Sequence, residues 1–228
     1  MILIIKNLLK RFLSVFFPFR CHVCSKNCDF GIVLCGDCIE KLKNSLHKPE
    51  KVTDTATDFD IYTMSSYSDF PSDLVKIIKY RPSKKLAQIL AKTCSEQADL
   101  KSFFKQDDIV IPVPMHEKRF EERGFNQAAV LAETYVDYVG CNYSPALIRS
   151  RYTKPQASCN EKERTTNLDN AFALDSNLTK SAFKGKRLIV IDDVATTGIT
   201  LQKSIEPLKE LEPKEIIALV VSHSYKKI

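Results

Sequence analysis

One thirteen-residue stretch, 188–200, constrains the fold more than any other part of the chain. It begins with four consecutive apolar residues, Leu188 to Ile191, and continues with two aspartates and a turn rich in threonine. An apolar run without alternation is typical of a parallel strand that is covered on both faces. Ligands of parallel sheets bind at the carboxyl ends of the strands. The stretch therefore predicts an α/β fold with a ligand site where Asp192 and Asp193 end the strand.

The residues that follow the apolar run suit a sugar phosphate. Each aspartate only accepts hydrogen bonds, so the pair can bind the vicinal 2- and 3-hydroxyls of a ribose. The turn leads into a helical pattern at 201–205, and its backbone N–H groups and hydroxyls are expected at a helix N-terminus, where a phosphate is favoured. Gly198 lets the backbone approach that phosphate closely. The alternative is that this polar turn binds no ligand. The candidate ligand-binding residues are Asp192, Asp193, Ala195, Thr196, Thr197, Gly198, Ile199 and Thr200.

Four cysteines in the N-terminal part predict a metal site. Cys21 and Cys24 form one Cys-x-x-Cys pair, and Cys35 and Cys38 form a second, with ten residues between the pairs. Each pair can hold two sulfurs about 3.5 to 4 Å apart around one ion. The alternative of disulfides is disfavoured because a chain without a signal peptide is expected in a reducing compartment. We therefore expect a structural zinc ion with these four ligands.

Two further cysteines leave questions open. Cys28 is a fifth thiol within the same loop and could replace Cys24 or Cys35, although the symmetric pairing is preferred. Cys159 lies in a polar, basic segment that could lower its pKa. The sequence assigns neither thiol a role.

The first 51 residues carry most of the positive charge. They hold nine Lys and Arg against four Asp and Glu, within a chain of net charge +6. Zinc bound by four thiolates would reduce this local excess to about +3. Such an excess would help a nucleic acid or an acidic protein surface to associate.

The apolar N-terminus raises the question of a membrane segment. Lys6, Lys10 and Arg11 interrupt the run before it reaches the roughly 20 residues that a transmembrane helix needs, and no small-residue cleavage site follows. Apolar residues recur at helical spacing, which favours a helix packed on its own domain over one at a membrane surface. We expect a cytoplasmic protein that is not an integral membrane protein, of undetermined oligomeric state.

The chain divides into two parts. Residues 1–48 are expected to form the N-terminal helix and the four-cysteine zinc finger, and the polar segment 48–58 is expected to be a linker. From 59 to 228, short apolar strands alternate with helices, as in a mostly parallel sheet flanked by helices. Pro207 should interrupt the helix after the threonine turn. The expected strands are 61–67, 109–114, 188–191 and 215–222, and the expected helices are 36–46, 72–79, 83–98, 125–138 and 201–205.

Two basic blocks could bind a pyrophosphate. Lys118, Arg119 and Arg123 follow the strand at 109–114, and an arginine fork matches phosphate oxygens two at a time. The polar block 149–164, with Arg151, suggests a mobile flap that could close over a ligand. The alternative is that these are ordinary solvated surface residues. Lys79 and Arg81, near the end of an apolar helix, are candidates with the same alternative.

These motifs together resemble a known family. The Asp-Asp-Val-Ala-Thr-Thr-Gly-Ile-Thr stretch resembles the phosphoribosyl pyrophosphate (PRPP) motif of type I phosphoribosyltransferases. The two cysteine pairs, Lys79-Tyr-Arg81, Pro112-Val-Pro114, Lys118 to Gln127, Lys154-Pro-Gln156 and the Asp-Asp turn occur in the same order in the ComF family. The resemblance covers nearly the whole chain, with Cys159 and Pro207 as departures.

The resemblance implies a type I phosphoribosyltransferase-like domain that binds PRPP with Mg²⁺. It also implies a cytosolic bacterial protein linked to the uptake of transforming DNA, with single-stranded DNA and a DNA-uptake helicase as partners. The alternative is an active enzyme in which Asp192 and Asp193 hold the ribose while its 5-phosphate unit passes to an unidentified acceptor in nucleotide metabolism. No segment indicates specificity for a purine or a pyrimidine base. The sequence therefore does not decide whether the protein turns over PRPP.

Overall fold

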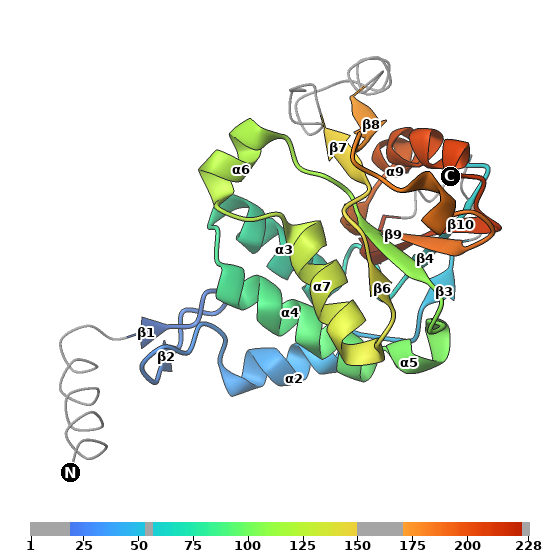
Figure 1. Ribbon diagram of the computed structural model, residues 1–228. Helices are drawn as coiled ribbons and strands as arrows, with labels where there is room; N and C mark the ends of the chain where they lie inside the picture. The colour runs from blue at the N-terminus through green and yellow to red at the C-terminus, as the bar shows by residue number, and fades with distance from the viewer. Residues whose placement is uncertain (1–18, 53–56, 150–170, 225–228) are drawn as a thin grey trace, which may run out of the picture.

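The computed structural model describes residues 19–52, 57–149 and 171–224. A six-stranded sheet lies at its centre in the order β3-β4-β10-β9-β5-β6 (Figure 1). Neighbouring strands are parallel except for β3, which runs antiparallel to β4 at one edge. The mostly parallel sheet predicted from the sequence is therefore confirmed. The strands are β3 (Glu50–Lys51), β4 (Asp60–Thr63), β5 (Ile109–Pro112), β6 (Asn142–Tyr143), β9 (Arg187–Ala195) and β10 (Glu215–His223).

Strand β9 is buried on both faces, as its apolar run predicts. Leu188 to Ile191 are all fully buried, and so are Ala218 to Val221 of the adjacent strand β10. However, β9 does not end at the aspartates, because its parallel pairing with β10 continues to Ala195. The expectation that the strand ends at Asp192 and Asp193 was wrong, since pairing on one side keeps the backbone extended for two more residues.

Helices cover one face of the sheet, and a mixed layer covers the other, so the domain has three layers. The first layer contains α2 (Gly36–Asn44), α3 (Phe70–Tyr80), α4 (Lys84–Gln97), α5 (Leu100–Phe103) and α7 (Gln127–Val139). The second contains the β7–β8 hairpin (Leu147–Arg149 and Phe172–Leu174), the short helices η2 (Lys180–Ala182) and η3 (Glu206–Leu211), and α9 (Ile199–Ile205).

Most helices lie within one or two residues of their predicted bounds. The side chain of Ser83 caps α4 by accepting from the backbone N–H of Leu86. Helix α9 ends at Ile205 and continues as the 3-10 helix η3 with Pro207 in its first turn, as the proline predicts. The basic block after β5 is a helix that was not predicted, α6 (Glu117–Arg123), which ends at Gly124 in the left-handed region with φ of 76°.

The cysteine-containing segment packs directly on the α/β domain. A small hairpin, β1 (Phe19–Arg20) with β2 (Asn27–Cys28), precedes α2. Leu34 and Leu42 belong to the same buried cluster as the apolar side chains of α3 and α4. Lys85 of α4 also donates a hydrogen bond to the carbonyl of Gly31 in the cysteine loop. The two predicted parts therefore share one hydrophobic core.

Part of the predicted organisation falls outside the described residues. The N-terminal helix, the flap candidate Arg151 and Cys159 belong to this group. The predicted linker 48–58 is described in part, and it contains the edge strand β3 followed by the buried Val52. Within the described ranges, no helix is long and apolar enough to cross a membrane.

Candidate functional site

The two aspartates lie where β5 and β9 separate. Strand β9 pairs with β5 as far as Ile191, whose carbonyl accepts from the N–H of Val113, and β5 ends at Pro112. Beyond this point, among the described strands, β9 keeps only β10 as a neighbour. Asp192 and Asp193 therefore lie at a strand edge at the carboxyl end of a parallel sheet, the position at which such sheets bind ligands.

Asp193 faces the helical layer and is paired with a lysine. The ammonium of Lys79, in the last turn of α3, donates to Oδ1 of Asp193 at 2.8 Å, and only 8% of the aspartate side chain is exposed. Burial alone would lower the pKa of Lys79, but the charges of Asp193 and Asp192 outweigh it and raise that pKa. Lys79 thus remains protonated at neutral pH and neutralises the buried carboxylate.

Asp192 faces the opposite side of the strand, because successive side chains of a strand alternate. Its Oδ1 accepts a hydrogen bond from the backbone N–H of Asp193 at 2.8 Å, and the residue is half-buried. Burial and the charge of Asp193 raise the pKa of Asp192 to about 7, although Lys79 and Arg149 act in the opposite direction. Asp192 therefore changes charge near neutral pH, whereas its neighbour is held by an ion pair.

Two arginines interact electrostatically with the two carboxylates, and Arg119 acts on both of these arginines. Burial lowers the pKa of Arg123 on α6, while the charge of Asp193 opposes this shift. Burial and the charge of Arg119 lower the pKa of Arg149, at the end of β7, to about 10, while Asp192 opposes this shift. The guanidinium of Arg149 also lies 5.1 Å from the ring centre of Phe172. Helix α6 and the β7–β8 hairpin thus add positive charge near the aspartates.

The structure distinguishes among the predicted basic residues. Arg119 and Arg123 act electrostatically on this site, while Lys118 is exposed on the same helix. Arg151 lies outside the described residues. Arg149 was predicted only as the first residue of the flap block 149–164, whereas Arg151 was the individual candidate in that block. The burial of Arg149 and its proximity to Asp192 appear only in the fold.

The threonine turn joins β9 to α9. Gly198 has φ of 72°, and a Cβ there would lie 3.3 Å from Cγ2 of Thr57, so both the backbone conformation and the close packing require glycine. Thr196 is exposed, and Thr197 and Thr200 are half-buried. Helix α9 has only seven residues, so its dipole is weak.

The four predicted cysteines come together in one cluster. Their sulfurs all lie within 4.8 Å of one another, with Cys21 to Cys38 at 3.8 Å and Cys24 to Cys35 at 3.6 Å. A tetrahedral zinc ion with Zn–S bonds of about 2.3 Å would hold its sulfurs about 3.8 Å apart. The cluster therefore has the geometry to hold a metal ion. Cys28 lies outside the cluster, with its sulfur 3.5 Å from the carbonyl oxygen of Lys26.

Backbone amides stabilise negative charge in this cluster. The N–H of Cys35 points at the sulfur of Cys21 at 3.5 Å. Burial raises the pKa of Cys21, but hydrogen bonds from the backbone of Cys24 and Cys35 outweigh this effect and lower it to about 6. Such N–H groups support thiolate ligands from outside the metal's own coordination shell.

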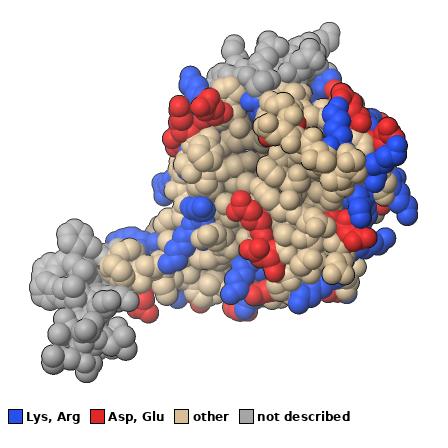
Figure 2. Space-filling model, in the orientation of Figure 1, with Lys and Arg blue, Asp and Glu red and all other residues tan. Residues whose placement is uncertain are grey.

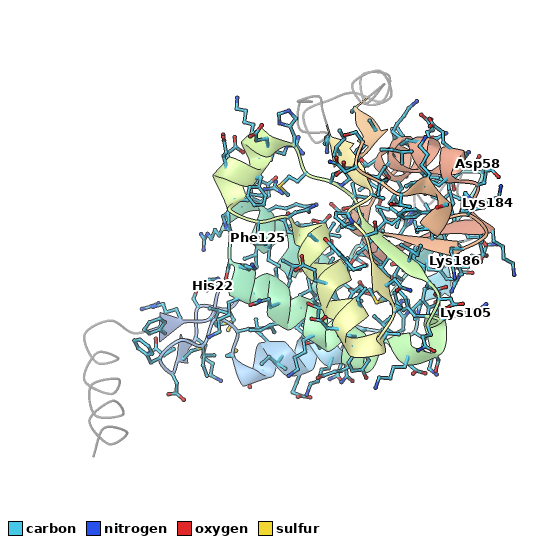
Figure 3. All side chains as sticks on the ribbon, viewed as in Figure 1. His22, Asp58, Lys105, Phe125, Lys184 and Lys186 are labelled. Atoms are coloured by element: carbon cyan, nitrogen blue, oxygen red, sulfur yellow. The ribbon has the colours of Figure 1, made fainter. Side chains whose placement is uncertain are left out.

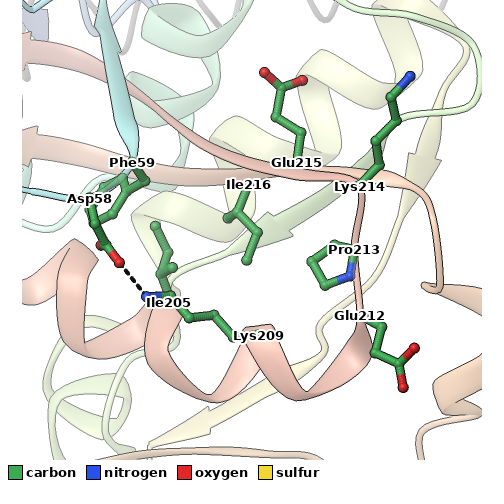
Figure 4. Close-up of a pocket in the computed structure, with 9 residues that line it drawn as sticks. All are labelled: Asp58, Phe59, Ile205, Lys209, Glu212, Pro213, Lys214, Glu215 and Ile216. Carbon is green, nitrogen blue, oxygen red and sulfur yellow. Dashed lines mark hydrogen bonds and ion pairs between the residues drawn. The ribbon is translucent and has the colours of Figure 1, made fainter.

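Two cavities lie away from the aspartates. A cavity of about 290 Å³ at the amino ends of β4 and β10 is bordered by the ion pair of Lys209 with Asp58 (Figure 4). A groove of about 760 Å³ lies between the cysteine loop and α4, with Ile32, Ile39 and Ile89 in its lining. Figure 3 places Asp58 and His22, which mark these two regions, at opposite sides of the molecule. Neither cavity contains the predicted sugar-phosphate residues.

Comparisons with known proteins place this site in a family context. The sequence profile of the phosphoribosyl transferase domain matches residues 126–227, which include the Asp-Asp turn but neither Lys79 nor the cysteines. Competence protein F of Haemophilus influenzae is 34% identical over 113 residues, which cover 49% of this chain and 48% of that protein. The DNA utilization protein YhgH of Escherichia coli O6:H1 is 27% identical over 192 residues, which cover 79% of this chain and 80% of that protein.

Other matches are more limited. Competence protein ComFC of Bacillus subtilis is 29% identical over 66% of this chain and 57% of its own length. The chain thus spans about half of the Haemophilus protein and less than two thirds of the Bacillus protein. Among solved structures, adenine phosphoribosyltransferase from Saccharomyces cerevisiae matches with 18% sequence identity and a TM-score of 0.39, over 83% of this chain and 89% of that one.

The segment that matches the phosphoribosyl transferase domain includes the strands and helices around the two aspartates. The profile match begins at α7 and includes β9, the turn, α9 and β10, the elements that position the two aspartates. The named relatives share competence or DNA utilization in their names. The chain is therefore similar in sequence to ComF-family proteins, and it combines a phosphoribosyltransferase-type domain with an N-terminal cluster of four cysteines.

Proposed function

We propose that this protein binds PRPP or a related ribose 5-phosphate at the edge of β9 and acts in DNA uptake. The observation that carries the proposal is the convergence of two aspartates with Lys79, Arg119, Arg123 and Arg149 at the carboxyl end of β9. Asp192, Asp193 and Arg149 belong to the segment that matches the phosphoribosyl transferase domain. A charged sugar phosphate needs such a mixed site, with acceptors for hydroxyls and donors for phosphates.

Each group of residues has a distinct task in this proposal. The turn 195–200 binds the 5-phosphate through backbone N–H groups and threonine hydroxyls. Asp192 accepts from a sugar hydroxyl, while Arg119, Arg123 and Arg149 bind the pyrophosphate through their guanidinium forks. Mg²⁺, when bound with PRPP, would neutralise part of the negative charge of the pyrophosphate.

The first test replaces both aspartates. Asp192→Ala with Asp193→Ala should abolish PRPP binding measured by calorimetry, because the sugar loses its acceptors while the arginines keep only nonspecific attraction for phosphate. Asp107→Ala serves as the control, since that side chain is 86% exposed and belongs to the opposite end of the sheet. An unchanged affinity in the double variant would contradict the assignment of the site.

The DNA-uptake role rests on the family and on a local surface. On the face drawn in Figure 2, basic side chains are interspersed with acidic ones, so attraction of DNA there must be local. Tyr80 is 81% exposed and Phe120 is 49% exposed, and each adjoins a basic residue, Arg81 and Arg119 respectively. Aromatic side chains next to cations bind unpaired bases by stacking, independently of base sequence. By resemblance to ComF proteins, we expect this surface to act in the cytoplasm together with a DNA-uptake helicase.

A second test addresses this surface. Tyr80→Ala with Phe120→Ala should weaken binding of single-stranded DNA by about tenfold or more, since each stacked base contributes about 1–3 kcal/mol. Ile148→Ala, which removes a 43% exposed aliphatic side chain, is the control. Fluorescence anisotropy with a labelled oligonucleotide measures both affinities. Equal affinities of the double variant and the control would contradict the stacking role.

For the cysteine cluster we propose a structural zinc ion with all four positions filled by protein ligands. Because Leu34 and Leu42 beside the cluster share the core of α3 and α4, loss of the ion should destabilise the whole domain and not only the loop. The ion has no position left for a substrate. It would therefore order the segment that precedes the domain.

Metal analysis tests this proposal. The purified protein should contain one zinc ion per chain, and Cys24→Ser should lose it and melt at a lower temperature. Cys28→Ser is the matched control, because its sulfur lies outside the cluster, and it should retain both zinc and stability. Zinc retained by the Cys24 variant, or lost equally from both, would argue against the four-cysteine site.

Turnover of PRPP is the second candidate function. One observation favours it: burial and the charge of Asp193 raise the pKa of Asp192 to about 7, near the value of an effective general base at neutral pH. In that role Asp192 would take a proton from the acceptor that attacks the anomeric carbon as pyrophosphate leaves. The acceptor remains unidentified in this proposal.

Pyrophosphate release tests turnover directly. With PRPP, Mg²⁺ and a panel of bases and amines, an active enzyme should release pyrophosphate at a rate that rises between pH 6 and 8. The reason is that Asp192, with its pKa raised to about 7, loses its proton over this range and only the ionised form acts as a base. Asp192→Asn should lose this increase. No release with any acceptor would leave the binding function as the account of the site.

A further inference from the structure

An apolar groove lies open beside the cysteine loop. It has a volume of about 760 Å³ and is lined by residues within 27–36 of the loop, by Ile39 of α2 and by Ile89 of α4. Two large apolar side chains of this loop are exposed, Phe30 at 43% and Ile32 at 42%, and Ile32 lines the groove. Apolar side chains that gather at an exposed concave surface mark a place where another segment or molecule binds.

The chain enters the described structure directly beside this groove. Strand β1 begins at Phe19, which pairs with Cys28, and Cys28 lines the groove. The rings of Phe19 and Phe30 are in edge contact, with their centres 4.8 Å apart. Residues 1–18 precede Phe19 and are therefore tethered at the rim of the groove. Tethering raises the effective concentration of a segment at its site, so a modest affinity is enough to hold it there.

The sequence of the tethered segment suits an apolar groove. Its apolar residues recur at intervals of three and four, the spacing with which an amphipathic segment binds such a groove. They include Ile5, Leu9, Phe12 and Phe16. Pro18 disfavours a helical conformation at the residue before it, so the segment can change direction ahead of β1. The spacing and the point of attachment thus favour the same occupant.

The charges of the groove and the segment are complementary. Asp29 lines the groove, and no residue in the described ranges forms an ion pair with its exposed carboxylate. Residues 1–18 contain no Asp or Glu and three cations, Lys6, Lys10 and Arg11. Exposed ion pairs contribute little to stability. A pair with Asp29 would therefore orient the segment, while apolar burial would hold it in place.

We propose that residues 5–16 of this chain bind the groove with their apolar side and cover the cysteine loop. The exposed Ile32 then becomes buried against a segment of its own chain. The groove contains none of the residues of the sugar-phosphate site, so this inference stands independently of the proposed function.

Photocrosslinking in the full-length protein tests the inference. A benzophenone amino acid replaces Phe12, the dilute protein is irradiated, and mass spectrometry identifies the crosslinked peptides. The probe should attach within the same chain to peptides that contain Ile32 or Ile89, with a yield that does not change with protein concentration. The same probe at Asn7, whose spacing places it opposite the apolar residues, should give these products with about fivefold lower yield. Leu9 provides a second position for the probe on the apolar side.

A substitution in the groove supplies the second arm of the test. Ile32→Glu would place a carboxylate against the apolar segment, so the yield from position 12 should fall by about fivefold or more. Ile148→Glu is the matched control, because Ile148 is 43% exposed on β7, and it should leave the yield unchanged. Ile32→Ser provides the same comparison if the glutamate variant does not fold.

Other outcomes would overturn the inference. Products that lie only outside the groove, or an unchanged yield in Ile32→Glu, would show that the segment does not occupy it. Crosslinks between two chains, with a yield that rises with protein concentration, would assign the groove to a second copy. Lipid adducts that replace the groove products when phosphatidylglycerol vesicles are added would assign the segment to a membrane surface.

Discussion

The structure depends on the burial of β9 on both faces. A strand covered on both sides can carry charge only at its ends, and each charge there must be neutralised or hydrogen-bonded. Asp193 meets this requirement through Lys79, and Asp192 meets it through a backbone N–H and a raised pKa. The different environments of the two neighbouring carboxylates follow from the alternation of side chains along one strand.

The same constraint brings the basic residues together. Strand β5 ends at Pro112 while β9 continues to Ala195, and the chain after β5 forms α6, whose Arg123 interacts electrostatically with Asp193. Helix α3 reaches this edge from the helical layer, and β7 reaches it from the other. Three elements thus direct cations at one strand end, and the local electrostatics of a sugar-phosphate site arise from how the layers meet.

The sequence predicted what depends on local patterns. The apolar run of β9, the paired cysteines and the effect of Pro207 were all visible, because each is encoded within a few neighbouring residues. Contacts between distant segments were not. Lys79 was an undecided candidate because nothing near it in sequence indicates that its partner lies 114 residues later.

Two further misses have related causes. Arg149 was predicted only as part of the flap block 149–164, because its burial and its interaction with Asp192 depend on the fold. The edge strand β3 was hidden in a segment whose polar composition predicted a linker, since two residues that pair at a sheet edge need little apolar surface. Short elements such as β3 and α6, and contacts between distant residues, thus required the structure.

The crystal structure of the protein soaked with PRPP and Mg²⁺ tests the central claim most directly. The account predicts the sugar at Asp192, the 5-phosphate at residues 196–200, and the pyrophosphate beside Arg119, Arg123 and Arg149. Density for PRPP in the cavity beside Asp58 and Lys209, with none at the edge of β9, would contradict it.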